Sequence, residues 1–398
     1  MRADRSAKAA QKERSKAAAA PAADHRAAII VSLDFGDDDY AERVEEVVRL
    51  VESAGVVRHR IVEGRRHRPD PKFYAGRGKV VEIGHAAAEL NAGYVVFNHE
   101  MSPAQQRNVE QELNVRTLDR TELILEIFAQ RAQTSEGKLQ VELARLEHLS
   151  TRLVRGWTHL ERQRGGFGRT GGPGETQLEL DRRYIATKVK TLKGKLRQLQ
   201  KQRGVQRRAR ERGDVLSVSI VGYTNAGKST LFNALTNAKA YEADQLFATL
   251  DTTTRRIWLP PANPVVLSDT VGFIRDLPHT LVAAFRATLE ETVRADLLLH
   301  VVDASSPVRE TQAGEVNKVL AEIGADATPQ IIVWNKIDAT QLAPGMERDQ
   351  YGRISRVFVS ARSAAGLNDL RAAIAEYGQG RNSAKRGPTE QTRSLQPQ

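Results

Sequence analysis

The sequence predicts an α/β protein in which a domain with a doubly wound, mostly parallel sheet follows a small α/β domain and a long antiparallel helical hairpin. Two observations predict this organisation. Strand-like apolar runs alternate with helical periodicity over residues 26–118 and again over residues 214–379, whereas residues 119–213 show only helical periodicity. We expect the polar, basic ends, residues 1–25 and 380–398, to be disordered tails.

The small α/β domain shows short apolar runs separated by helical patterns, as in residues 40–54, where four valines recur at helical spacing. The expected strands are residues 27–33, 56–61, 94–97 and 115–118. The expected helices between them are residues 40–54, 79–90 and 103–113. Because strands that alternate with helices pair in parallel, this pattern predicts a small parallel sheet.

Two long helical patterns, residues 120–163 and 175–212, flank a glycine-rich loop at residues 165–174, six of whose ten residues are glycine. Apolar residues form a stripe along the second helix: Ile185, Val189, Leu192, Leu196 and Leu199. Helices joined in this way should pack antiparallel as a hairpin. The alternative is that the loop is only a flexible connector.

Positive charge is concentrated in the hairpin. Residues 151–213 hold 18 Arg or Lys against five acidic residues, whereas the whole chain has a net charge of +11. Such a field attracts polyanions, so we expect RNA as a partner, although a solvated helix face is the alternative. The expected contacts around the loop are three arginines and an aromatic ring that can stack on a base: Arg162, Arg164, Arg169 and Phe167.

Composition excludes several other classes of protein. The chain has no cysteine, which rules out disulfides, cysteine-based zinc fingers and thiol nucleophiles and fits a cytoplasmic location. No apolar run reaches the ~20 residues of a membrane span, so we expect no stable membrane insertion. An organellar targeting peptide is the weaker interpretation of residues 1–25, because Asp4, Glu13 and Asp24 count against it.

A phosphate-binding loop follows the expected strand at residues 215–221 and opens a helix. It consists of Gly222, Tyr223, Thr224, Asn225, Ala226, Gly227, Lys228 and Ser229, with Thr230 next in the helix. Glycines let backbone N–H groups face phosphates, and the helix N-terminus adds positive potential. We expect Lys228 to bridge the β- and γ-phosphates of a nucleotide and Ser229 to coordinate Mg²⁺.

The identity of the nucleotide base is predicted by three residues that follow an apolar strand: Asn335, Lys336 and Asp338. This stretch resembles the guanine-specificity motif of P-loop GTPases, in which the aspartate accepts hydrogen bonds from guanine N1 and its exocyclic amine, which adenine cannot supply. Supporting evidence comes from Ser360-Ala361-Arg362, which ends the next strand and resembles the stretch that meets guanine O6 through a backbone N–H. We therefore expect GTP and GDP as ligands.

Asp269 and Gly272 fit the motif in which an aspartate holds Mg²⁺ and a glycine N–H senses the γ-phosphate. A threonine between this motif and the phosphate-binding loop should complete the metal shell. Thr249 is selected by resemblance to related GTPases, and residues 252–254 remain competitors.

Two residues at positions that matter for catalysis are notable by comparison with other GTPases. Phe273 stands where many small GTPases carry a glutamine that orients water, so hydrolysis should be slow without a partner. Asn225 stands where some GTPases bind K⁺ beside the phosphates, although it can instead simply cap the loop. The expected catalytic residues are Lys228, Thr249, Gly272 and Asn225.

The chain resembles the HflX family of ribosome-associated GTPases in several motifs. These are residues 102–107, 118–131, 172–183, 222–230, 246–251 and 269–274, and the resemblance extends from about residue 27 to 378. It implies binding to the large ribosomal subunit and its RNA, stimulation of GTP hydrolysis there, and dissociation of stalled or idle ribosomes.

Two further expectations accompany this resemblance. The chain should act as a monomer, and the glycines and lysine at residues 76–79 are a turn before a helix or a second nucleotide or RNA contact. The alternative function is a GTP-switched RNA-binding protein whose hydrolysis is incidental. A membrane or cytoskeletal GTPase is disfavoured because the basic charge is confined to the hairpin.

Overall fold

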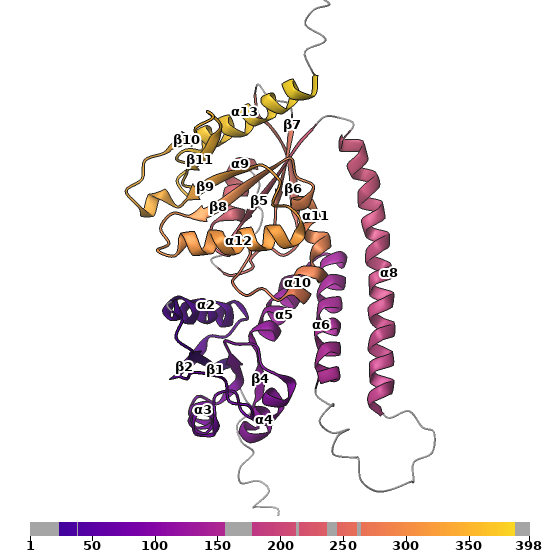
Figure 1. The fold of residues 1–398 in the computed structure, drawn as a ribbon, viewed down its shortest axis with the longest axis vertical. Helices are drawn as coiled ribbons and strands as arrows, with labels where there is room; N and C mark the ends of the chain where they lie inside the picture. The colour runs from indigo at the N-terminus through magenta and orange to yellow at the C-terminus, as the bar shows by residue number, and fades with distance from the viewer. Residues whose placement is uncertain are drawn as a thin grey trace, which may run out of the picture. The chain divides into compact units, whose positions relative to one another are not determined.

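The computed structural model describes residues 24–37, 39–155, 177–211, 215–236, 245–260 and 264–386. The chain divides into two compact units, Met1–Ile127 with Leu149–Gly174 and Phe128–His148 with Glu175–Gln398. Figure 1 traces the elements in chain order. The residues expected to contact RNA lie outside the described residues: the loop 165–174, Arg162, Arg164, Phe167 and Arg169.

The first unit contains a parallel four-stranded sheet with the order β2-β1-β3-β4. Its strands are β1 (Asp24–Asp34), β2 (Arg58–Arg65), β3 (Ala92–Phe97) and β4 (Arg116–Leu118). The connecting helices are α2 (Tyr40–Ser53), α3 (Arg77–Leu90) and α4 (Pro103–Leu113). The central strand β1 buries every side chain from Ala27 to Leu33, as expected of a parallel strand covered on both faces. The predicted alternation of strands and helices is confirmed.

The edge strand β2 is displaced from its predicted position at residues 56–61 and continues to Arg65. It pairs with β1 in register from Arg58 opposite Ala27 to Arg65 opposite Asp34. The polar side chains in its second half are mostly exposed, so they give no apolar signal. Backbone pairing with β1, rather than side-chain pattern, therefore sets its length.

Among the described residues, three helices lie between β4 and the second sheet: α5 (Arg120–Arg131), α6 (Ser135–Arg155) and α8 (Gln177–Glu211). The single run predicted over residues 120–163 is interrupted before α6, where the Thr134 hydroxyl accepts the Gly137 N–H at 2.9 Å and caps the helix. Helices α6 and α8 run antiparallel (Figure 1) and pack through Leu143, Leu192 and Leu196. Two leucines of the predicted stripe therefore lie in the helical interface.

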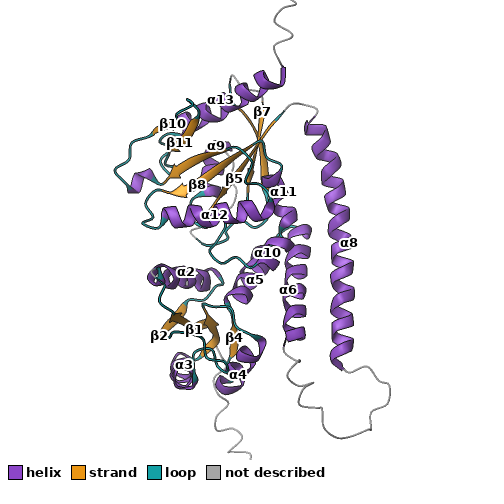
Figure 2. Cartoon of the chain, viewed as in Figure 1, coloured by secondary structure: helices purple, strands orange, loops and turns teal. Residues whose placement is uncertain are grey.

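The second unit contains a seven-stranded sheet with the order β10-β11-β9-β8-β5-β7-β6, shown in orange in Figure 2. Its strands are β5 (Leu216–Gly222), β6 (Thr253–Trp258), β7 (Pro264–Asp269), β8 (Leu297–Asp303), β9 (Gln330–Asn335), β10 (Gly345–Arg348) and β11 (Ile354–Phe358). Its helices are α9 (Lys228–Thr236), α10 (His279–Ala284), α11 (Arg286–Val293), α12 (Arg309–Ile323), the 3₁₀ turn η1 (Ile337–Ala339) and α13 (Leu367–Arg386). Only the edge strands β6 and β10 pair antiparallel to their neighbours. The predicted doubly wound, mostly parallel sheet is confirmed.

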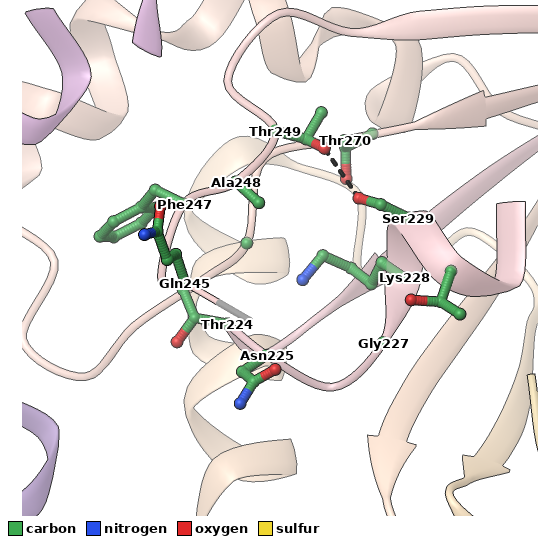
Figure 3. A pocket seen from close by; sticks show the side chains of 12 residues that line it. Thr224, Asn225, Gly227, Lys228, Ser229, Gln245, Phe247, Ala248, Thr249 and Thr270 are labelled. Atoms are coloured by element: carbon green, nitrogen blue, oxygen red, sulfur yellow. Dashed lines mark hydrogen bonds between the residues drawn. The ribbon is translucent and has the colours of Figure 1, made fainter. Parts of the chain in front are cut away.

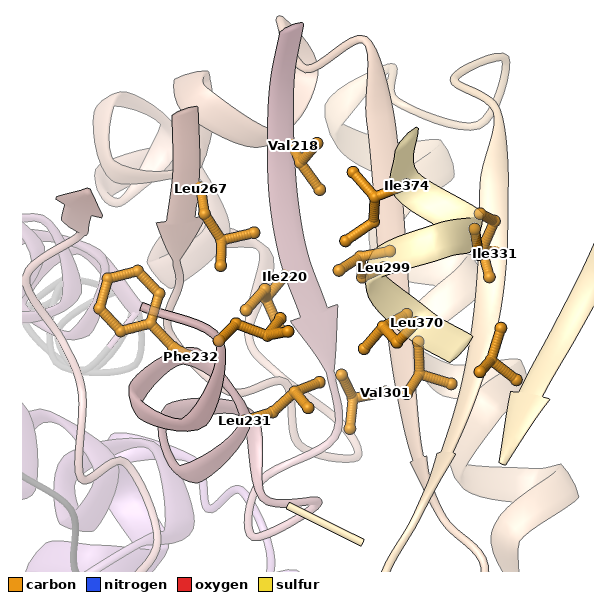
Figure 4. Close-up of a cluster of buried hydrophobic side chains, with 14 of the residues drawn as sticks. Val218, Ile220, Leu231, Phe232, Leu267, Leu299, Val301, Ile331, Leu370 and Ile374 are labelled. Carbon is orange, nitrogen blue, oxygen red and sulfur yellow. The ribbon is translucent and has the colours of Figure 1, made fainter. Parts of the chain in front are cut away.

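The core of this unit lies between the central strands and the helices α9 and α13 (Figure 4). Ile220 of β5 and Val301 of β8 are fully buried, as are Phe232 of α9 and Ile374 of α13. This packing fixes the carboxyl ends of β5, β7, β8 and β9 at one edge of the sheet. Ligands of doubly wound sheets bind at that edge.

Each predicted tail, residues 1–25 and residues 380–398, includes residues that the structure places in a strand or a helix. The strand β1 starts at Asp24, whose N–H donates to the Asn91 carbonyl at 3.0 Å, so the tail predicted over 1–25 is wrong for its last two residues. Helix α13 continues to Arg386, because Tyr377 and Arg381 both contact Asp296, at 2.7 Å each. These contacts carry the helix beyond Gly378 and Gly380.

Candidate nucleotide-binding site

The phosphate-binding loop joins β5 to α9, and its backbone requires glycine at two positions. Gly222 and Gly227 have φ of +151° and +88°, and a Cβ would collide with the Val301 carbonyl at the first and with the Asn335 amide at the second. Asn225, with φ of +58°, also has a left-handed backbone and lines the pocket. The loop is thus a tight turn whose backbone lies open to a ligand (Figure 3).

Lys228 is buried at the first position of α9, and its Nζ donates to the Tyr223 carbonyl at 2.6 Å. The ammonium therefore folds back over the loop instead of entering solvent. Burial lowers the pKa of Lys228 to about 8, because removal from water disfavours the charged form. A phosphate bound in the loop would stabilise the charged form of Lys228 and raise its pKa again.

Oxygen atoms of three side chains meet beside Lys228. The Thr249 hydroxyl lies 2.7 Å from Ser229 Oγ (Figure 3). The Ser229 hydroxyl donates to Asp269 Oδ2 at 2.7 Å, and the Thr249 hydroxyl lies 3.1 Å from the same carboxylate oxygen. Asp269 Oδ1 is buried and has no hydrogen-bond partner among the described residues. Burial raises the pKa of Asp269, and hydrogen bonds and the charge of Lys228 oppose that rise. Two hydroxyls and a carboxylate with an unsatisfied oxygen are a donor set that fits Mg²⁺.

Gly272 lies where the β7 strand leaves the sheet, against the phosphate-binding loop. A Cβ on Gly272 would meet Thr224 Cγ2 at 2.9 Å and Lys228 Nζ at 3.0 Å. The next residue, Phe273, is fully buried, and its backbone pairs with the loop: its N–H donates to the Gly222 carbonyl and its carbonyl accepts the Thr224 N–H. The Phe273 side chain therefore belongs to the core and offers no group to a water molecule.

The Asn-Lys-x-Asp stretch is organised around buried Asn335. Its Nδ2 donates to the Ala226 carbonyl and its Oδ1 accepts the Ala361 N–H, both at 2.9 Å. Lys336, with φ of +64°, forms an ion pair with Asp303 Oδ2 at 2.8 Å that holds its side chain. Asn335 thus links the phosphate-binding loop to the stretch at Ser360–Arg362, while Asp338 is exposed on η1.

The pocket brings together the phosphate-binding loop, Thr249 and Gly272 as the sequence predicts. It also contains four residues that sequence reasoning did not single out: Gln245, Phe247, Ala248 and Thr270. All four neighbour predicted site residues along the chain. Their closeness in sequence to Thr249, Asp269 and Gly272 is the signal that could have indicated them. Thr252 to Thr254, the competitors of Thr249, do not line the pocket.

The doubly wound sheet, the phosphate-binding loop at its switch point and the Asn-Lys-x-Asp motif together define a P-loop GTPase. Three family models match: "GTP-binding GTPase N-terminal" over residues 41–129, "GTP-binding GTPase Middle Region" over 131–210 and "50S ribosome-binding GTPase" over 217–336. The chain is also 52% identical over 350 residues to GTPase HflX of Escherichia coli K12, a match that covers 88% of this chain and 82% of the relative. The chain belongs to the HflX family, and it is a GTP hydrolase.

A second relative and a solved structure are also similar to this chain. GTPase HflX of Magnetococcus marinus is 48% identical, over 83% of this chain and 77% of that protein. The crystal structure of a GTP-binding protein from Sulfolobus solfataricus in complex with GDP is similar at 23% identity with a TM-score of 0.46, covering 89% of this chain and 99% of that one. Within the described residues, no helix combines the length and apolar character that crossing a membrane requires.

Proposed function

We propose that this GTPase binds the large ribosomal subunit and dissociates stalled or idle ribosomes, with the subunit stimulating GTP hydrolysis. The observation that carries the proposal is the burial of Phe273. In many small GTPases the residue at this position is a glutamine that orients the attacking water, and a buried phenylalanine ring cannot do this. A site that lacks this group depends on a partner for fast hydrolysis. The match to a family model described as a 50S ribosome-binding GTPase supports the ribosome as that partner.

The helix α8 supports an RNA partner. In addition to the leucines that contact α6, it carries exposed basic side chains at Lys190, Lys195, Arg197 and Lys201. Exposed lysines and arginines along one helix neutralise phosphates and release counterions, so binding should weaken steeply with salt. The glycine-rich loop 165–174 and its arginines are proposed to reach ribosomal RNA.

The chemistry of the site follows from its residues. Lys228 and the loop N–H groups are placed to neutralise the β- and γ-phosphates, and Gly272 leaves room for the γ-phosphate beside Lys228. We propose that Ser229, Thr249 and Asp269 hold Mg²⁺, which supplies positive charge to the phosphates. Asn225 is proposed to hold K⁺ beside the phosphates; equal hydrolysis rates in K⁺ and Na⁺ buffers would exclude that role.

Replacing residues 165–174 by a neutral linker of equal length tests the function. Ribosome dissociation, followed by sucrose-gradient sedimentation, should be lost while affinities for GTP and GDP stay unchanged. A Lys228→Ala variant provides the opposite control, because it should lose nucleotide affinity and dissociation together. Normal dissociation by the linker variant would reject the proposed role of the loop. Retained RNA binding without dissociation or ribosome-stimulated hydrolysis in the unmodified chain would favour a GTP-switched RNA-binding protein.

A further inference from the structure

The segment 245–251, which carries Thr249, lies in the domain predicted over residues 214–379, which we name the G domain, and is held by residues outside that domain. The holding residues lie at the end of α5 and the start of α6, residues 128–137, which we name the α5–α6 corner. The corner and the segment belong to the same compact unit. The hydrogen bonds between them join residues more than 110 positions apart, as between Thr134 and Asp251. Contacts form at both ends of the segment, so Thr249 lies between two anchors.

The first anchor is Asp251. Its Oδ2 accepts the Gln133 N–H at 2.8 Å and the Thr134 N–H at 3.0 Å, and its Oδ1 accepts the Thr134 hydroxyl. The same hydroxyl accepts the Gly137 N–H, so the carboxylate and Thr134 together cap the 21-residue helix α6. A negative charge at a helix N-terminus is favourable, and a Cβ at Gly137 would collide with the carboxylate.

The second anchor is aromatic. Phe247 is buried, and its ring meets the ring of Phe128 edge-to-face with centroids 4.7 Å apart. Phe247 has φ of +55°, a left-handed conformation that costs a bulky residue free energy and persists only where surrounding contacts hold it. The neighbouring Gln245 side chain accepts a hydrogen bond from Arg131 of the corner.

We propose that the α5–α6 corner positions Thr249 for its contact with the metal and the γ-phosphate. Phe128, Thr134 and Asp251 are then positioning residues for GTP hydrolysis, two of them outside the G domain. Because coupling between sites is reciprocal, GTP binding must also stabilise the capped start of α6, the helix that packs against the basic α8. This inference rests on the metal-binding role proposed above for Thr249.

The test compares full-length variants by their dissociation constants for a non-hydrolysable GTP analogue and for GDP, both with Mg²⁺. Asp251→Ala removes all three hydrogen bonds and should weaken analogue binding about tenfold, with GDP affinity changed less than twofold. Thr134→Val removes only the hydroxyl and should weaken it about threefold. The double variant should weaken analogue binding by less than the product of the two single effects, because both changes remove the hydrogen bond between the Thr134 hydroxyl and Asp251.

Two controls separate positioning from general destabilisation. Thr134→Ser keeps the hydroxyl and should behave as the unmodified protein. Ser102→Ala removes an equivalent helix cap in the first unit, where the Ser102 side chain accepts the Gln105 N–H, and should lower stability without changing the preference for the GTP analogue over GDP.

The variant Thr249→Ala distinguishes failure of the positioning role of the corner from failure of the metal-binding role of Thr249. If Thr249→Ala lowers the preference for the GTP analogue but Asp251→Ala and Thr134→Val do not, the positioning role of the corner is overturned. If Thr249→Ala itself leaves the preference unchanged, the metal-binding role proposed for Thr249 fails, and the inference fails with it.

Discussion

Asn335→Ala should destabilise the second unit and weaken nucleotide binding together. The Asn335 side chain is buried, and it satisfies two backbone groups of different loops, the Ala226 carbonyl and the Ala361 N–H. Alanine leaves both groups buried without their partner, at a cost of about 1–3 kcal/mol each. Allowing for partial entry of water, the expected loss is about 2–4 kcal/mol. The phosphate-binding loop also loses its link to the guanine side, so affinity for GTP and GDP should fall.

Urea unfolding of the full chain measures this loss, followed by the fluorescence of its three tryptophans, of which Trp258 and Trp334 lie in the seven-stranded sheet. A loss of this size should lower the urea midpoint of the second unit by about 1 M. The matched control is Asn317→Ala on the exposed face of α12, which removes an amide that is not buried and should change stability by less than about 0.5 kcal/mol. A midpoint within about 0.2 M of the unmodified protein would refute the reasoning, because it would mean that the two loops do not depend on this side chain.

Two further predictions concern the ligand. Lys228 must carry its proton to neutralise phosphate, and burial lowers its pKa to about 8 in the free site. GTP affinity should therefore fall as pH rises, by about fourfold between pH 7 and 8.5. Isothermal titration calorimetry at both pH values measures this change in affinity. Lys228→Arg stays charged and should remove the pH dependence, so an equal pH dependence in that variant would contradict the role of Lys228. Asp338→Asn should weaken GTP binding by about 100-fold relative to ATP, because the amide cannot accept both guanine donors. Competition binding against each nucleotide measures this preference, and unchanged selectivity would remove Asp338 from base recognition.

Sequence reasoning recovered the parts of the fold and site that follow from local pattern. The phosphate-binding loop could be predicted because its glycines, Lys228 and Ser229 are contiguous and lie between a strand and a helix. The alternation of strands and helices could be predicted for the same reason. The length of β2 could not, because pairing with β1 extends an edge strand whose side chains carry no apolar pattern.

Long-range contacts were the other limit. The helix α13 passes two glycines because Arg381 pairs with Asp296, a residue from a distant part of the chain. The cap that Asp251 provides to α6 likewise joins residues more than 110 positions apart. Asp251 stands in a motif that could be recognised, but nothing in the motif indicates which backbone groups its carboxylate meets. Such pairings depend on tertiary structure and therefore first become visible in it.

We propose that the large ribosomal subunit completes the catalytic site of this GTPase. The most direct test is GTP turnover by the purified full chain, measured as phosphate release with and without purified large subunits, and with small subunits as the matched control. We expect slow turnover alone, an increase of at least about tenfold with large subunits, and no comparable increase with small subunits. Fast turnover by the chain alone, or no stimulation by large subunits that it demonstrably binds, would contradict the account.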